Sequence, residues 1–352
     1  MRKSGFLFAI TIFLISSCKY SEHDYSVVDF PLPVQLKSQN ITLMGVLSDP
    51  KEIIILDSVY VVKDSKSEFI LHIFSLDNHE YLGGFIRRGR GPSEEILIQS
   101  ISRAADNSLY YKTLNSLTLA QFSPKTKSME SIMIYEVPVD ALTVAYPLNG
   151  RKVLGWNYNL HENEFLLYNP LDNQYSDFGN GFPQTGKNLT LEENHRLFSN
   201  KQMTIKPDKQ KFATAYMSFP MIRVFNSKDG KLINEFNKAQ EQDFPKAMIN
   251  RNATQDEIKE LVENYFTVTS TDQYIYALYS GKTKGELYPD LFTPNFSPLD
   301  FGNEIHVWDW EGNPVKKISL DQMIFSFDVC LKDSTILAIS VNDPDKIMVF
   351  GI

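Results

Sequence analysis

The chain repeats one pattern six times, and this repetition constrains the fold more than any other feature of the sequence. Each copy begins with an apolar run, a turn containing Asp or Asn, and a second apolar run, which together are typical of a β-hairpin. A third apolar run that ends in an aromatic residue follows, and a polar turn comes after it. The hairpin segments are EIIILDSVYVV, ISRAADNSLYY, AYPLNGRKVLGW, TIKPDKQKFATAY, TSTDQYIYALY and DVCLKDSTILAIS, and the aromatic residues are Phe74, Phe122, Tyr168, Phe225, Trp308 and Phe350.

This pattern predicts an all-β fold, a six-bladed β-propeller, because four short antiparallel strands in a repeat of roughly 45 residues make one blade. A β-sandwich or an open array of hairpins is the alternative, and six copies in one register argue against both. The sixth copy stops at Ile352, directly after its third strand. We therefore expect an N-terminal strand, within Pro33 to Met44, to complete this blade and close the ring, so that no sheet edge stays open. The predicted propeller spans residues 33–352.

The first residues have the pattern of a signal peptide. Arg2 and Lys3 precede an apolar stretch, and the fourteen residues between Lys3 and Cys18 are fewer than the roughly 20 that a membrane-spanning helix needs. The small residues before Cys18 resemble the lipobox of bacterial lipoproteins. We therefore predict a signal peptide at 1–17, lipidation of Cys18 and a tether at 18–32, which would make the protein a lipoprotein of the cell envelope, on the outer membrane, facing the periplasm or the surface. An ordinary secretory signal with an incidental cysteine is the alternative.

Charge and cysteine content narrow the classes of partner. The net charge is -8 and the sequence has no basic block, which argues against nucleic acid or an anionic membrane face as a partner. If Cys18 is lipidated, Cys330 has no other cysteine with which to form a disulfide. The partners that we expect are a protein, a peptide or a glycan in the cell envelope, with the membrane contacted only through the lipid anchor.

The long connections of the predicted propeller all fall after second or fourth strands, which places them on one face of the ring. Clustered long loops on one face are typical of a binding surface. One connection contains Thr254 three residues before Glu257, with Ile258 next to it, and this capping box predicts one short helical insertion that either binds a partner or covers its neighbours. The long connections are residues 87–97, 157–164, 180–202, 238–264 and 280–303.

The last of these connections is rich in aromatic residues and contains three prolines. Such stiffened loops can present rings to a glycan or a peptide at little entropic cost. We therefore select Tyr288 and Phe292 as candidate binding residues. The alternative is that these rings, with Phe296 and Phe301, form a small core within the loop.

The stretch GGFIRRGRGPSEEI begins at Gly83 and belongs to the first long connection. A phosphate-binding glycine loop requires a strand followed by a helix, and here a strand follows, so the pattern excludes a nucleotide site. Gly89 and Gly91 can adopt positive φ angles, and Glu94 or Glu95 can accept hydrogen bonds from an arginine or from backbone N–H groups.

The segment from Gly89 to Glu94 reads G-R-G-P-S-E, and with it the sequence resembles the TolB-like six-bladed propeller lipoproteins of the Bacteroidota. The resemblance covers essentially the whole chain and implies the propeller fold, but the family has no assigned reaction to carry over. Arg87, Arg88 and Arg90 are candidates for binding an acidic group of a ligand, and a structural role between blades is the alternative. Glu94 is a further candidate binding residue.

Candidates for catalysis are few. Sialidase-type S-x-D-x-G-x-T-W turns are absent from the sequence, and the histidines lack the spacing of zinc ligands. His161 and His195 could form a metal site with Glu162, Glu164, Glu192 and Glu193, although solvated loop charges are the favoured interpretation.

Asp328 is the one clear acid that we expect on the inner strands, and one carboxylate cannot hold calcium. Cys330, in the same segment, is expected to be buried and inert. We therefore expect no catalytic residues, no metal and no cofactor. The predicted function is a lipid-anchored, non-catalytic binding or scaffold propeller, and the alternative is a hydrolase or lyase with its site at the mouth of the channel.

Overall fold

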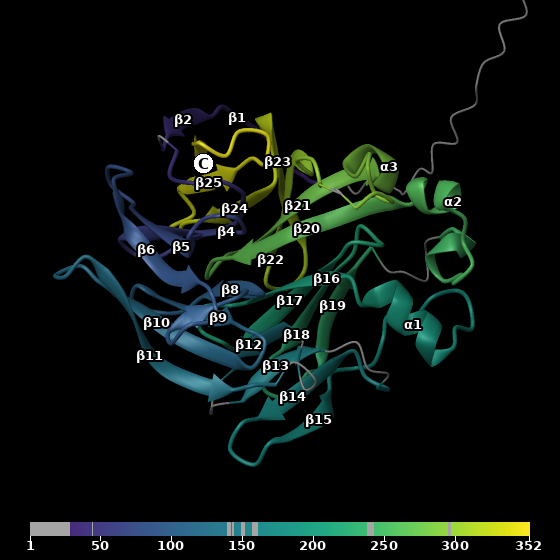
Figure 1. Ribbon diagram of the computed structural model, residues 1–352. Helices are drawn as coiled ribbons and strands as arrows, with labels where there is room; N and C mark the ends of the chain where they lie inside the picture. Colours follow the sequence, from purple (N-terminus) through teal and green to yellow (C-terminus); the bar gives the residue numbers. More distant parts are fainter. Residues whose placement is uncertain are drawn as a thin grey trace, which may run out of the picture.

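The computed structural model describes residues 29–43, 45–138, 142, 144–148, 152–156, 161–237, 243–294 and 297–352. The strands of this part of the chain form six sheets that stand around a common centre, which confirms the six-bladed propeller (Figure 1). The signal peptide and the tether up to residue 28 lie outside the described residues, including Cys18.

Each blade contains four antiparallel strands that follow one another in the sequence, except where the N-terminal segment contributes. Blade 1 contains β3 (Pro50–Ile55), β4 (Val59–Asp64), β5 (Phe69–Ser75) and β6 (Tyr81–Arg88), and β7 (Glu94–Glu95) extends it. Blade 2 contains β8 (Ser100–Arg103), β9 (Ser108–Lys112), β10 (Ser116–Ser123) and β11 (Ser128–Glu136), and blade 3 contains β12 (Val144–Pro147), β13 (Val153–Trp156), β14 (Phe165–Asn169) and β15 (Gln174–Phe178). Blade 4 contains β16 (Lys201–Ile205), β17 (Lys211–Tyr216), β18 (Ile222–Asn226) and β19 (Leu232–Phe236), and blade 5 contains β20 (Val262–Ser270), β21 (Tyr274–Thr283), β22 (Gly302–Asp309) and β23 (Pro314–Ile324).

Blade 6 joins the two ends of the described chain. It contains β24 (Ser326–Val329), β25 (Thr335–Ile339), β26 (Lys346–Gly351) and, at its outer edge, β2 (Gln39–Thr42). The antiparallel pairing of β2 with β26 confirms that an N-terminal strand closes the ring. The strand β1 (Pro33–Leu36) was not anticipated, and it pairs in parallel with β23 as a fifth strand of blade 5.

The core is divided between the interfaces of neighbouring blades. Because successive side chains of a strand point to opposite faces, one strand serves two interfaces. In β4, for example, Val59 and Val61 pack against blade 2, whereas Tyr60 and Val62 pack against blade 6. This alternation explains the unbroken apolar runs of the repeats, since both faces of the middle strands are buried.

The long connections carry the helices, which lie together beside blades 4 and 5 (Figure 1). They are α1 (Leu191–Phe198), α2 (Gln255–Lys259) and α3 (Lys284–Leu287), with a 3-10 turn η3 (Lys246–Met248). α2 confirms the helix predicted after Thr254, whereas α1 and α3 were not predicted. All three begin at a threonine whose side chain accepts from the backbone of a glutamate three residues later.

The connections around α1 and α2 share a hydrophobic cluster with blade 4, so they form a packed layer rather than open loops. The cluster includes Phe182, Leu197, Phe198, Phe219, Phe244, Met248 and Leu261.

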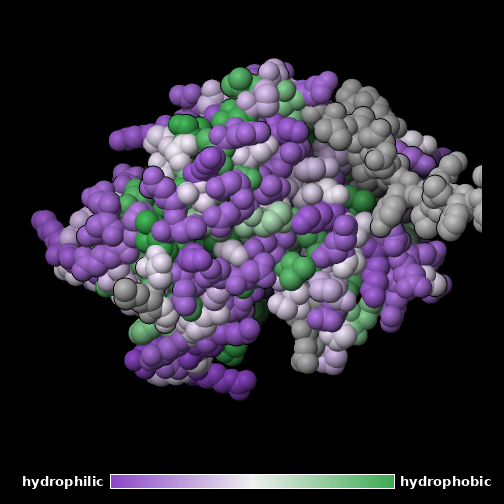
Figure 2. Space-filling view, turned by 90° about the horizontal axis from the view of Figure 1, so that it is seen from above, coloured by the Kyte–Doolittle hydropathy of each residue, from purple (hydrophilic) through white to green (hydrophobic). Residues whose placement is uncertain are grey.

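In the described part of the chain, no helix is long and apolar enough to cross a membrane. Seen from above, the surface is mostly hydrophilic, with hydrophobic residues scattered over it (Figure 2).

Candidate functional site

A cavity of about 900 Å³ occupies the centre of the ring. Its walls come from the inner strands of all six blades, β3, β8, β12, β16, β20 and β24. Turns on the short-turn face, including those at Asp106 and Lys209, extend the wall at one end. A channel of this kind is a natural place for a ligand in a propeller, because ligand sites are usually concave and partly apolar.

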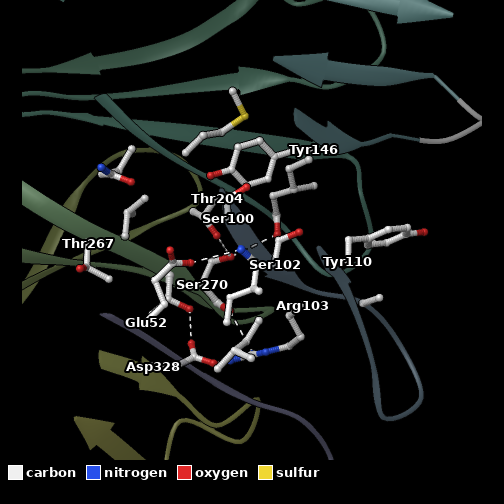
Figure 3. A pocket seen from close by; sticks show the side chains of 18 of the residues that line it. Glu52, Ser100, Ser102, Arg103, Tyr110, Tyr146, Thr204, Thr267, Ser270 and Asp328 are labelled. Atoms are coloured by element: carbon white, nitrogen blue, oxygen red, sulfur yellow. Dashed lines mark hydrogen bonds and ion pairs between the residues drawn. The ribbon is translucent and has the colours of Figure 1, made fainter. Parts of the chain in front are cut away.

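Hydroxyl side chains dominate the polar part of this wall. Ser100 and Ser102 come from β8, Thr204 from β16, and Thr267 and Ser270 from β20, and Figure 3 shows them gathered around one space. The hydroxyls of Thr204 and Ser270 are 2.8 Å apart and join blades 4 and 5. Tyr110 and Tyr146 add aromatic rings to the wall. The hydroxylated inner strands were visible in the sequence, but their convergence required the ring.

Asp328 lies on β24 and lines the cavity. Its Oδ2 accepts from Arg103 Nη2 at 2.5 Å and from the backbone N–H of Ile55 at 2.6 Å, and its Oδ1 accepts from the hydroxyl of Thr269. Arg103 also donates to the carbonyl of Val329 at 2.6 Å. This carboxylate therefore ties blade 6 to blades 1, 2 and 5, which is a structural use of its charge.

Glu52 is a second acid on the inner strands, so the expectation of Asp328 alone was wrong. Glu52 lies on β3 and is paired with Lys63 of the adjacent strand. Its Oε2 accepts from the backbone of Ile101 at 3.2 Å, and Lys63 donates to the carbonyl of Gln99 at 3.1 Å. In the sequence, Glu52 stands directly before a run of isoleucines in the first predicted hairpin, and for this reason it was not recognised as a residue of the channel wall.

Phe301, in the aromatic connection at 280–303, lines the cavity together with Phe266 and Phe325. Phe301 stacks on Phe266 with ring centroids 3.7 Å apart and on Phe325 with centroids 4.5 Å apart. Tyr288 packs edge-on against Phe301 at 6.4 Å, and burial raises the pKa of the Tyr288 hydroxyl. This arrangement agrees with the alternative interpretation of a core within the loop. Phe292 differs, because it is 42% exposed, and Phe296 lies outside the described residues.

The candidate arginines of the first long connection have different surroundings. Arg88 donates to the backbone carbonyls of Asp64, Ser67 and Ile96, and thereby holds the connection against blade 1. Arg87 forms an exposed ion pair with Glu68 at 2.9 Å, and Arg90 is exposed. These residues stay predicted binding residues, with Arg88 in a position that also serves the fold.

Glu94 accepts from the backbone N–H of Gly91 at 2.8 Å, in line with the predicted use of a backbone donor. Gly89 and Gly91 do not use the positive φ angles open to glycine; in this stretch Gly83, Ile86 and Ser93 have positive φ angles. Glycine is required at both positions because a larger side chain would collide with Glu94. A Cβ on Gly89 would lie 1.9 Å from the Glu94 carboxylate, and one on Gly91 would lie 2.9 Å from it.

His161 and His195 contact each other, with ring centroids 4.8 Å apart, but the proposed glutamates do not join them as a metal site. Glu164 is fully buried and forms ion pairs with Arg223 and, at 3.4 Å, with Lys201. Arg223 also pairs with Glu235. Glu192 binds Arg196 and Arg251. Among the residues that the structure describes, no three His, Cys, Asp or Glu side chains are grouped to hold a metal ion.

Cys330 is half-buried, so the expectation of a buried thiol was wrong. Burial alone would raise its pKa, but the Ser334 hydroxyl at 3.2 Å and neighbouring backbone N–H groups lower it overall. The thiol lies at the start of the β24–β25 turn, outside the wall of the cavity.

Comparison with known proteins supports the architecture. The sequence profile of the family described as TolB-like 6-blade propeller-like matches residues 31–332. No curated protein sequence matches the chain.

Proposed function

The chain belongs to the TolB-like 6-blade propeller-like family, and from this premise we propose that it is a non-catalytic binding propeller that takes its ligand into the central channel. The observation that carries the proposal is the cavity of about 900 Å³ with hydroxyl side chains from three blades. A volume of this size lies within the roughly 300–1,000 Å³ range of ligand pockets.

The charges of the channel favour binding over hydrolysis or lyase chemistry. General acid–base catalysis needs a carboxyl group that is held next to the reacting atoms and can exchange a proton there. Glu52 is engaged by Lys63, and Asp328 is engaged by Arg103 and two further donors. These carboxylates hold the blades together, and hydroxyl groups are left to contact the ligand.

The size and the chemistry of the channel suit a short oligosaccharide or a peptide segment. Serine and threonine hydroxyls both donate and accept, so they match ligands that are rich in hydroxyl or amide groups. The rings of Tyr110 and Tyr146 provide apolar contact area beside them.

Filling the channel tests this function. Ser102→Trp places a large ring in the cavity, and we expect loss of the peptides or glycans that the wild-type protein retains from a cell-envelope extract, measured by mass spectrometry. Thr126→Trp, on the exposed outer turn of blade 2, is the matched control and should retain them. Both variants are compared with the wild type by thermal melting. Unchanged retention by a folded Ser102→Trp protein would contradict the proposal.

The exposed residues of the long-loop face support a second surface for a protein partner. Phe292 is 42% exposed and has the Lys259 ammonium 5.9 Å from its ring, and Arg87 and Arg90 are exposed on the first connection. We propose this face as the scaffold surface. Phe292→Ala combined with Arg90→Ala should then lose a protein partner that Ser102→Trp still binds.

Anchoring through Cys18 completes the proposal. The family suggests an envelope-associated protein, and the sequence from Ile15 to Cys18 supports lipidation at that cysteine. We expect Cys18→Ala to leave the membrane fraction, whereas the wild type stays there after a high-salt wash. A Cys18→Ala protein that stays bound to membranes would contradict the lipid anchor.

A further inference from the structure

The cations of the cavity wall are paired with carboxylates, with one exception among the described residues. Lys51 pairs with Asp49 at 2.7 Å, Arg103 with Asp328 at 2.5 Å, Lys201 with Glu164 at 3.4 Å and Lys206 with Asp208 at 2.5 Å. The Lys209 ammonium has no carboxylate within ion-pair distance in the described part of the chain. Its neighbour is the ring of Tyr110, with the ammonium 5.7 Å from the ring centroid.

The backbone at Lys209 is unusual for a lysine. Lys209 has a φ of 59° in the β16–β17 turn, and Asn107 has a φ of 56° in the corresponding β8–β9 turn of blade 2. Asparagine tolerates the left-handed region better than lysine does, because its short polar side chain bonds locally. A lysine at this position therefore lowers the stability of the turn, but it places an ammonium group over the ring of Tyr110 at the wall of the cavity.

Burial reinforces this interpretation of the lysine. Lys209 is half-buried, and desolvation lowers the pKa of its ammonium. A partly desolvated cation gains more from an anion than an exposed one does, since the local dielectric is lower. The protein as a whole carries a net charge of -8, so it does not attract anions at long range and needs a local cation to hold one.

We propose that Lys209 is a subsite that binds a carboxylate of the ligand, and that the ligand is an oligosaccharide containing uronic acid residues. This inference rests on the proposed binding function of the channel. The ammonium pairs with the sugar carboxylate beside Tyr110, while the hydroxyls of Ser100, Ser102 and Thr204 bond with the sugar hydroxyl groups. A saccharide fits better than an acidic peptide, because the hydroxyl groups of the wall match a ligand that carries hydroxyl groups along its length.

Titration calorimetry with three probes tests this proposal. The probes are tetragalacturonate, the neutral saccharide cellotetraose and the acidic peptide tetraglutamate. We expect the wild type to bind tetragalacturonate in preference to the other two, and added salt should weaken this binding. Lys209→Asn should bind tetragalacturonate roughly tenfold to a hundredfold more weakly, the range expected for a lost hydrogen bond to a charged group.

Lys127 offers a matched control. It also has a positive φ, 50°, but it lies exposed on the β10–β11 turn and does not line the cavity. Lys127→Asn therefore makes the same change of residue and of charge. Both variants should melt at or slightly above the wild-type temperature, and only Lys209→Asn should lose affinity.

Each other outcome overturns a defined part of the inference. Equal binding of cellotetraose, or unchanged affinity in Lys209→Asn, rejects Lys209 as a carboxylate subsite but leaves a binding channel. Binding of tetraglutamate in place of the saccharide rejects the uronic acid assignment. Binding of none of the probes rejects the inference as a whole, whereas the channel function is judged separately by Ser102→Trp on envelope material.

Discussion

Replacing Asp328 by alanine should remove a large part of the stability of the ring, because this side chain bonds to three blades other than its own. Its carboxylate accepts from the Ile55 N–H at 2.6 Å, from Arg103 Nη2 at 2.5 Å and from the Thr269 hydroxyl. The Asp328 side chain is 3% exposed and that of Arg103 is 13% exposed, so water cannot replace the lost partner easily.

The expected size follows from the groups that stay behind. Asp328→Ala leaves the Arg103 guanidinium without its carboxylate, and breaking a buried ion pair in this way costs about 3–5 kcal/mol. The carbonyl of Val329, 2.6 Å from Arg103, reduces this cost, whereas the unsatisfied Ile55 N–H adds about 1–3 kcal/mol. We therefore expect a loss of about 3–5 kcal/mol from a free energy of unfolding that is about 5–15 kcal/mol in typical domains.

Urea unfolding of four proteins measures this loss. They are the wild type, Asp328→Ala, Arg103→Met and a protein with Arg103→Met and Asp328→Leu, in which apolar groups replace the whole pair. We expect the double variant to be more stable than Asp328→Ala, because it leaves no buried charge unpaired. A loss below about 1 kcal/mol in Asp328→Ala, at an unchanged slope of the free energy against urea, would refute the reasoning.

Three further perturbations test other parts of the structure. Deletion of residues 19–45 removes β1 and β2, exposes the edge of β26, and should cause aggregation and loss of the cooperative melt; a monomer with unchanged melting would contradict ring closure. Burial alone would raise the pKa of Asp64, but the backbone N–H groups of Asp49, Lys66, Ser48 and Ser67 outweigh it and lower the pKa below 3.8. The stability from this carboxylate is therefore present above about pH 4 and is lost as the pH falls through the lowered pKa, so the urea midpoint should fall less between about pH 6 and 3 in Asp64→Asn than in the wild type. Arg88→Ala should lose about 1–3 kcal/mol, because its guanidinium bonds to three carbonyls, and Arg87→Ala should lose less than about 1 kcal/mol as an exposed pair; equal melting temperatures for the two variants would contradict these different roles.

The fold was predictable because strand periodicity is a local property that recurs in each blade. The turn at Asp106, for example, lies between two apolar runs, and the structure places it between β8 and β9. Features that depend on contacts between distant segments were not predicted. The parallel pairing of β1 with β23 depends on where the closed ring brings residue 33. The capping boxes at Thr190 and Thr283, by contrast, have the same T-x-x-E pattern as the one at Thr254, so the sequence did carry a signal for α1 and α3 that was missed.

The candidate site was harder to predict, because its contacts join residues that are far apart in the sequence. Arg103 and Asp328 are separated by 225 positions, and neither flanking sequence reveals the other. Lys209 looked like an ordinary turn residue until its ammonium was placed at the cavity wall over Tyr110. Arg88 attracted attention through its glycine-rich context, but its three backbone acceptors come from residues that the sequence does not mark.

The pairing of β2 with β26 sets the order in which the chain can fold. Gly45, just after β2, donates to Asp345, just before β26, and the two residues are 300 positions apart. The four antiparallel strands of each of the first five blades are contiguous in sequence, so they can form as the chain emerges during synthesis or export. The sixth blade must wait for the last strand, and the long loop that it closes makes this step slow. A chain cut short before β26 therefore retains an unpaired strand at its beginning and an open blade at its end, and both are exposed to proteolysis and aggregation.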